Sequence, residues 1–161
     1  MRFRTIPTQR IPTGKVVYEG YNFDFEPHGD LKGITSLAID DLQLEIDHTG
    51  RVLYVWDYCP YQGWKHTNRL PPDSTPGILT IIPDAPIIPG VSRRLKERGA
   101  WPVFVNPEHG WICIGDSDVP EPFESVEFAR NTIAVLKEGD LKAIWLRPEK
   151  LPDEIALSSG L

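Results

Sequence analysis

The sequence predicts a mainly β protein, a β-rich α+β chain in which hairpins build an antiparallel sheet or a small sandwich. Three observations support this fold class. The chain has 16 prolines in 161 residues, about twice the usual share of ~5%, and proline breaks helix interiors. Apolar runs rich in Val, Ile, Trp and Tyr occur in pairs, and a Gly-containing turn joins the two runs of each pair. The prolines cluster between these pairs, so they mark the boundaries of regular structure.

The first strands are expected early in the chain. The run KVVYEGYNFDFE (15–26) supplies one or two of them. The run LQLEID (42–47) alternates apolar and polar residues, which is typical of a strand with one wet face. The turn at 48–51 and the strand-forming run VLYVWDY then complete a hairpin over about 41–58.

Further strands and one helix are expected after residue 76. GILTII (77–82) reads as a strand, and a second hairpin joins WPVFV to WICIG within 101–115. A third joins NTIAVL to LKAIWL within 131–146, and its apolar runs lack alternation, which indicates that both faces are covered. The segment VSRRLKERG predicts a short helix near 91–98, with its basic residues on the wet face and Gly99 as the stop.

Length and composition exclude several classes of protein. The 161 residues fit a single domain over 1–161, for which we expect loose ends at 1–14 and 153–161. The pI of about 5.2 and the net charge of −6 disfavour a nucleic-acid binder that works by bulk charge.

Neither a membrane span of ~18 apolar residues nor the apolar centre of a signal peptide is found, so we expect a cytoplasmic protein without a membrane partner. In that compartment Cys59 and Cys113 are better explained as buried hydrophobes than as a disulfide.

The acidic residues fall into two blocks. Residues 17–50 carry eight acidic side chains against one lysine, and residues 107–129 carry six and no basic one. We expect the first block to contact a basic partner through Asp40, Asp41, Glu45 and Asp47, which lie on or beside the first hairpin. Alternatives for this group are a solvated face that prevents edge pairing, or cation binding without a calcium-type loop. We expect Asp116 and Asp118 of the second block to be part of the same contact. The alternatives for this pair are hydrated loop residues, a metal site or paired catalytic carboxylates.

Aromatic residues cluster between positions 56 and 64. Trp56 lies inside a predicted strand and is expected in the core. Tyr61 and Trp64 follow in a loop with Pro and Gly, so we expect both to be accessible and to anchor a partner. No zinc-type pair, P-loop, dinucleotide fingerprint or nucleophile elbow occurs. We therefore expect no catalytic, cofactor-binding or metal-binding residues.

The chain resembles a known class of proteins along most of its length. The run LQLEIDHTGRVLYVWDYCPY, the hairpin around HGWICIG and the ending FARNTIAVLKEGDLKAIWLRPEKLP are similar to small acidic immunity proteins encoded beside bacterial polymorphic toxins. The resemblance implies a cytoplasmic, often β-rich, non-catalytic domain that binds and neutralises one cognate toxin.

Two functions of different classes follow. The first is a non-enzymatic immunity protein that blocks a toxin domain, with its acidic groups steering a basic partner. The alternative is a small hydrolase or a ligand-binding β-protein with an aromatic-lined pocket. A concave site that joins Cys59 with His66, or Asp116 with His109, would favour the hydrolase. A third option, a subunit of a larger assembly, would show apolar surface reserved for its partner.

Overall fold

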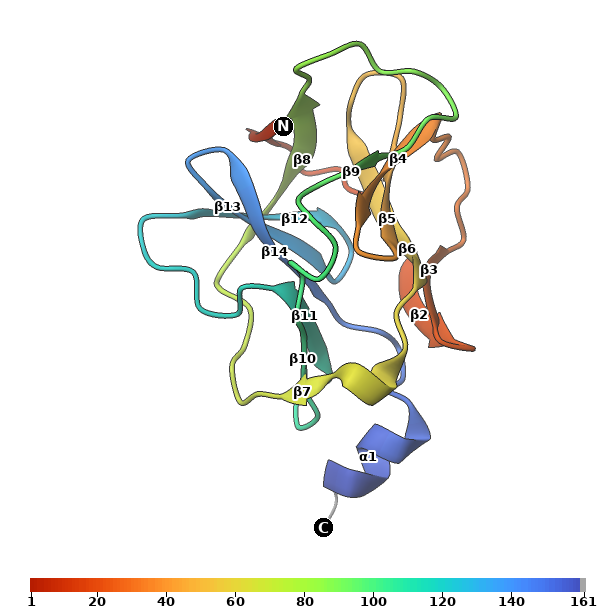
Figure 1. The fold of residues 1–161 in the computed structure, drawn as a ribbon, viewed down its shortest axis with the longest axis vertical. Coiled ribbons are helices and arrows are strands. Elements are labelled where there is room, and N and C mark those ends of the chain that lie inside the picture. Colours follow the sequence, from red (N-terminus) through yellow and green to blue (C-terminus); the bar gives the residue numbers. More distant parts are fainter. Residues whose placement is uncertain (160–161) are drawn as a thin grey trace.

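The structure, a computed structural model, describes residues 1–159 and confirms the mainly β fold. Two sheets contain all the strands of this part of the chain, and Figure 1 shows them beside each other. The larger sheet has eight strands in the order β1-β8-β12-β13-β14-β11-β10-β7. Their bounds are β1 Arg2–Pro7, β8 Thr75–Ile82, β12 Glu124–Ala129, β13 Thr132–Lys137, β14 Asp140–Leu146, β11 Trp111–Gly115, β10 Val103–Asn106 and β7 Lys65–His66.

The smaller sheet has six strands in the order β2-β3-β6-β5-β4-β9. Neighbouring strands are antiparallel except β4 and β9, and the larger sheet likewise contains two parallel pairs, β7 with β10 and β8 with β12. These parallel pairs join segments that are distant in sequence, so the sheets are mixed rather than built from hairpins alone. The bounds are β2 Lys15–Glu19, β3 Asn22–Glu26, β6 Val52–Tyr58, β5 Leu42–Ile46, β4 Thr35–Ile39 and β9 Arg93–Arg94.

The main hydrophobic core lies between the two sheets. The six-stranded sheet contributes Phe23, Phe25 and Leu44, and the eight-stranded sheet contributes Leu79 and Phe128, all at most 1% exposed. Each such side chain stabilises the fold by roughly 1.5–3 kcal/mol through its removal from water. The alternating pattern of β5 places every second residue in this core, which is why one face of the six-stranded sheet remains polar.

The predicted hairpins are present. β5 and β6 pair within 41–58, β10 and β11 pair within 101–115, and β13 and β14 pair as expected. The run 15–26 forms the further hairpin β2–β3, and β8 occupies the expected strand at 77–82. These segments were predictable because apolar periodicity and turn residues are local properties of the chain.

A second, smaller apolar cluster covers the outer face of the eight-stranded sheet. Cys113, Ile133, Val135, Ala143 and Trp145 are at most 5% exposed and point away from the main core. Partly buried side chains from nearby strands and from the loop after β11 pack over them. The prediction that both faces of the last hairpin are covered is therefore confirmed.

The predicted helix near 91–98 is wrong. Arg93 and Arg94 instead form β9, which pairs in parallel with Leu37 and Ala38 at the edge of β4. The backbone N–H of Leu95 also donates to Ala38, at 2.8 Å. A helix of eight residues is only marginally stable by itself. The backbone hydrogen bonds offered by the open edge of β4 therefore favour the strand over the helix.

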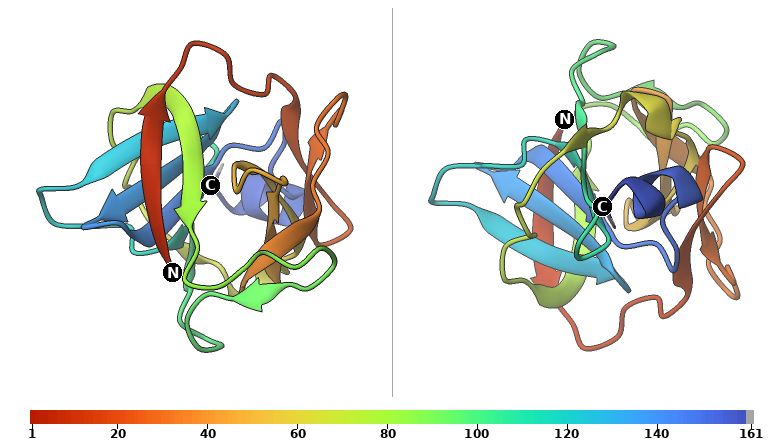
Figure 2. Two further views of the ribbon diagram at one scale, coloured as in Figure 1. Left: turned by 90° about the horizontal axis from the view of Figure 1, so that it is seen from above. Right: turned by 90° about the horizontal axis from the view of Figure 1, so that it is seen from below.

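The expected loose ends are wrong for most of their length. β1 pairs along all of Arg2–Pro7 with β8, and Phe3 is buried. At the other end Asp153–Ser159 form the helix α1, whose Ile155 is buried in the main core. Residues 160–161 lie outside the described residues. Figure 2 shows α1 across one end of the space between the sheets, and no helix within 1–159 has the length and apolar character needed to cross a membrane.

Candidate functional site

The strongest candidate site is a shallow groove on the outer face of the six-stranded sheet, over β2, β3 and β6. We call it the Trp56 groove; its volume is about 400 Å³. Four of its eight lining residues carry a carboxylate and none carries a basic group. The lining residues are Val17, Glu19, Asn22, Phe23, Asp24, Glu26, Trp56 and Asp57.

The strand register explains why these side chains meet. On β3, Phe23 and Phe25 point into the core, so Asn22, Asp24 and Glu26 point outward. β2 places Val17 opposite Asp24 and Glu19 opposite Asn22. Lys15 is the cross-strand neighbour of Glu26 at the edge of the sheet, outside the groove lining.

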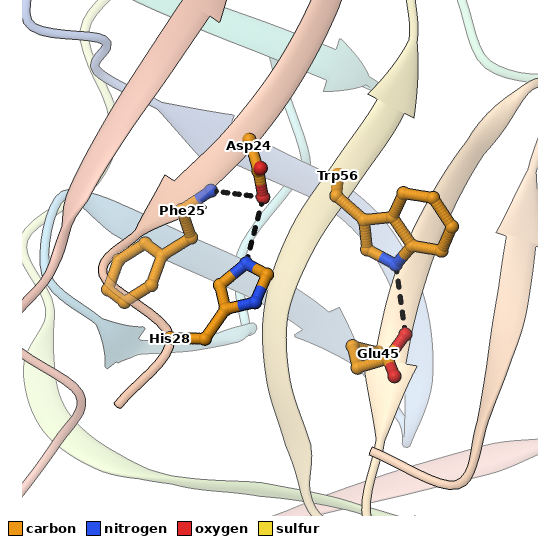
Figure 3. Close-up of polar contacts among 5 residues, drawn as sticks. All are labelled: Asp24, Phe25, His28, Glu45 and Trp56. Atoms are coloured by element: carbon orange, nitrogen blue, oxygen red, sulfur yellow. Dashed lines mark hydrogen bonds and ion pairs between the residues drawn. The ribbon is translucent and has the colours of Figure 1, made fainter. Parts of the chain in front are cut away.

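Trp56 is fixed in position by a half-buried carboxylate. Its indole Nε1 donates to Glu45 Oε1 at 2.9 Å, across β6 and β5 (Figure 3). Burial raises the pKa of Glu45, whereas the hydrogen bond from Trp56 and the nearby His28 lower it. A side chain at Gly33 would collide with the Glu45 carboxylate, so glycine there leaves the space that this carboxylate occupies.

A second polar contact orders the far side of the groove. Asp24 Oδ1 accepts the backbone N–H of Phe25 at 2.8 Å and lies 3.1 Å from His28 Nε2. The His28 ring stacks on Tyr54 with its centroid 4.6 Å away. Figure 3 shows both carboxylate contacts, one on each side of the β6 strand. Polar contacts therefore hold side chains in place on both sides of β6.

The chemistry of this surface favours cationic partners. An indole beside several carboxylates attracts Lys or Arg side chains through both charge and cation–π contact. The surface is shallow and open, which suits contact with a protein surface better than enclosure of a small substrate.

The predicted acidic group Asp40, Asp41, Glu45 and Asp47 is not one surface. Glu45 supports Trp56 as described, at the margin of the groove. Asp40 Oδ1 accepts the Gly99 N–H at 2.6 Å, and Asp41 pairs with Arg98 at 2.7 Å.

Asp47 belongs to the turn between β5 and β6. Its Oδ1 accepts the Thr49 N–H, the Thr49 hydroxyl and the Arg51 N–H, at 2.8, 2.6 and 3.1 Å. Three of the four predicted carboxylates thus make their contacts in turns or with loop residues, because Asp is favoured where the backbone turns.

The two predicted aromatic anchors lie in different environments. Tyr61 is half-buried in the short 3-10 helix η1 (Tyr61–Gly63). The prediction that Trp64 is accessible is wrong: its side chain is 9% exposed and stacks on Phe23, with the ring planes 13° apart. Trp56, expected in the core, is half-buried: it packs against the main core and its indole Nε1 donates to Glu45.

Asp116 and Asp118 lie in a separate depression of about 350 Å³ over the outer apolar cluster. Asp118 pairs with Arg69 at 3.1 Å, and its backbone N–H donates to Asp116 at 2.8 Å. Arg69 lines the same depression, so this site is less uniformly acidic than the Trp56 groove. His109 lines a different cavity, so the pairing of Asp116 with His109 is not formed there.

The cysteines are not placed for nucleophilic chemistry. Both are free and buried, and burial raises the pKa of Cys59 to about 11 and that of Cys113 still further. A raised pKa disfavours the reactive thiolate. The residues that line the cleft beside Cys59 include no histidine, and His66 is exposed on β7.

Within residues 1–159, no three His, Cys, Asp or Glu side chains are grouped so that they could hold a metal ion. Comparison of the chain with protein-family models, curated proteins and solved structures finds no match.

Sequence reasoning missed the residues that form the groove. The run NFDFE alternates Phe with Asn, Asp and Glu, so the outward position of Asp24 and Glu26 was open to prediction. What the sequence does not carry is the adjacency of β3 and β6, which brings these carboxylates to Trp56.

Proposed function

We propose that this chain is a non-enzymatic binding protein of the immunity type, which binds and neutralises a basic toxin domain through the Trp56 groove. The observation that carries the proposal is the lining of the groove: four carboxylates around a half-exposed indole, with no basic side chain. Carboxylates steer a cationic surface into contact, and a central aromatic residue provides the anchor typical of protein interfaces.

The hydrolase alternative has less support. A thiol whose pKa is raised to about 11 is protonated at neutral pH. A general base needs a partner within hydrogen-bond reach. Neither the cleft beside Cys59 nor the depression beside Asp116 brings a histidine to the proposed nucleophile or acid.

The experiment uses the protein encoded by the adjacent gene as the partner. Coexpression tests whether this chain relieves its toxicity, and surface plasmon resonance measures the association and dissociation rates. Glu19 and Glu26 are exposed and accept no side-chain hydrogen bond in the described structure, so Glu19→Lys with Glu26→Lys changes charge without removing a hydrogen bond or ion pair of residues 1–159. We expect association to slow about tenfold or more at low salt, and Trp56→Ala to speed dissociation.

A matched control carries the same change in charge away from the groove, in the connection before β8 and at the start of β14. Asp73→Lys with Asp140→Lys also shifts the net charge from −6 to −2, because each reversal adds two units. Both residues are exposed and lie away from the groove lining. Equal slowing by the two pairs would show that only total charge matters and would refute the groove. A neighbouring product that is neither bound nor neutralised would refute the immunity role.

A further inference from the structure

A second concave site lies at the seam between the two sheets. The end of β6 meets the segment that leads into β10, and together they form a cleft of about 270 Å³. Its walls are apolar: Leu42, Trp64, Trp101 and Ile114 line it, and each is at most 9% exposed. Two indoles in the lining of a small cleft are typical of a site for an apolar or aromatic group.

Carboxylates lie at the same cleft. Asp40 and Asp41 line it from the turn between β4 and β5. One oxygen of Asp40 accepts the Gly99 N–H, and no hydrogen bond within residues 1–159 occupies the other. The negative charges of both carboxylates are felt inside the cleft, at the Cys59 thiol. Burial is the largest cause of the raised pKa of Cys59, and the charges of Asp40 and Asp41 raise this pKa as well.

Cations already lie beside this site. Arg98 Nη1 contacts Asp41 at 2.7 Å, with both side chains about half exposed. Lys96 Nζ lies 4.6 Å from the centroid of the Trp101 ring. One carboxylate and one indole of this region, Asp41 and Trp101, therefore each hold a positive group.

From this combination we infer that the seam cleft binds a small organic ammonium ion, with its apolar ring against the tryptophans and its protonated amine on Asp40. The volume is just below the ~300 Å³ of the smallest typical ligand pockets, which fits a single ring with a short amine chain. A ligand with an uncharged ring would leave the Asp40 carboxylate without a cationic partner. A ligand that carries its own carboxylate would be repelled by the charge of Asp40. This site is separate from the Trp56 groove and does not depend on the proposed immunity role.

Two variants test the site with little risk to the fold. Gly63 lines the cleft, and an added Cβ there would meet nothing within 4 Å, so Gly63→Leu adds bulk at the cleft without a collision. Asp40 has a positive φ of 54°, a conformation that asparagine also accepts. Asp40→Asn keeps an oxygen for the Gly99 N–H but removes the charge.

Isothermal titration with phenethylammonium, 2-phenylethanol and phenylacetate separates the alternatives. We expect the ammonium ion to bind at least about tenfold more tightly than the alcohol, the difference that a charged hydrogen bond contributes. Gly63→Leu should abolish binding, whereas Asn68→Leu, an exposed position outside the cleft, should leave it unchanged. Asp40→Asn should remove most of the preference for the ammonium ion. Arg98→Ala should strengthen binding about two- to fivefold, because a competing cation is lost.

Thermal unfolding of each variant shows whether the fold is kept. Equal affinity for the three probes, or no binding of any of them, would overturn the inference. So would binding to folded Gly63→Leu that matches the unaltered protein. Because no partner protein is used, the result is independent of the coexpression experiment.

Discussion

The outer faces of the two sheets differ in how deeply each buries a tryptophan. On the eight-stranded sheet Trp145 is 1% exposed and is covered by side chains from neighbouring strands and from the loop after β11. On the six-stranded sheet Trp56 is half-buried, hydrogen-bonded to Glu45 and bordered by carboxylates (Figure 3). The first face carries a covered apolar cluster, whereas the second carries an acidic groove.

The sequences of the strands explain this difference. β13 and β14 carry apolar residues at consecutive positions, so both their faces must be removed from water. β3 and β5 alternate apolar with polar residues, so only one face must be covered. A sheet face that stays polar and ordered is free for function, and this is where the carboxylates gather.

The largest expected effect is the cost of truncating each tryptophan. Trp145→Ala should lower the free energy of unfolding by about 3–5 kcal/mol, the usual range for a fully buried tryptophan. Trp56→Ala should cost only about 1–2 kcal/mol, because its side chain is half-exposed and loses one hydrogen bond. Urea denaturation of both variants measures the difference. Equal costs would mean that the outer face of the six-stranded sheet is as much a core as the other.

A smaller effect is expected at the turn that joins β5 to β6. Asp47→Ala removes the acceptor of three hydrogen bonds to Thr49 and Arg51. We expect the free energy of unfolding to fall by about 1–2 kcal/mol. Asp47→Asn, which keeps an acceptor oxygen, is the control and should cost less than half as much. If both variants matched the unaltered protein, Asp47 would be free for partner contact after all.

The smallest expected effect is the pH dependence contributed by Glu45. Burial raises its pKa above the usual value of about 4.5, so the folded state holds the proton more tightly than the unfolded state. The contribution of Glu45 to stability therefore falls as pH rises through the interval between these two pKa values. Glu45→Gln keeps an acceptor for Trp56 and removes this dependence.

The stability difference between Glu45→Gln and the unaltered protein should therefore change with pH. From about pH 4 to about pH 7 the variant should gain stability relative to the unaltered protein. The gain should be less than about 1 kcal/mol, because solvent screens a half-exposed group. Urea midpoints at several pH values measure it. A difference that shrinks with rising pH would contradict the assigned direction.

Local patterns predicted the hairpins correctly. Each of the patterns used depends only on residues that are neighbours in the sequence. These patterns are the alternation in 42–47, the turn at 48–51 and the unbroken apolar runs of the last hairpin. The same kind of reasoning failed at 91–98, because Val91 and Leu95 have helical spacing but the edge of β4 supplies backbone partners from a distant part of the chain.

The burial of Trp56 and Trp64 differs from the expected burial for a related reason: Trp56 is less buried than expected and Trp64 more. Trp56 lies in a strand, which suggested burial, and Trp64 lies in a loop, which suggested exposure. Strand residues alternate between two faces, and only the packing of the sheets decides which face is covered. The loop after η1 folds Trp64 onto Phe23 and Tyr18, a contact between segments far apart in sequence.

By itself, then, the sequence determined the β-rich architecture, its turns and the two-sided burial of the last hairpin, because periodicity and turn chemistry act over short stretches. Only the tertiary structure decided which carboxylates share a surface. Asp40 and Asp41 reached the seam cleft, Asp47 was used in its own turn, and Asp24 and Glu26 met Trp56. Strand order within a sheet sets such neighbours, and strand order is a property of the whole fold.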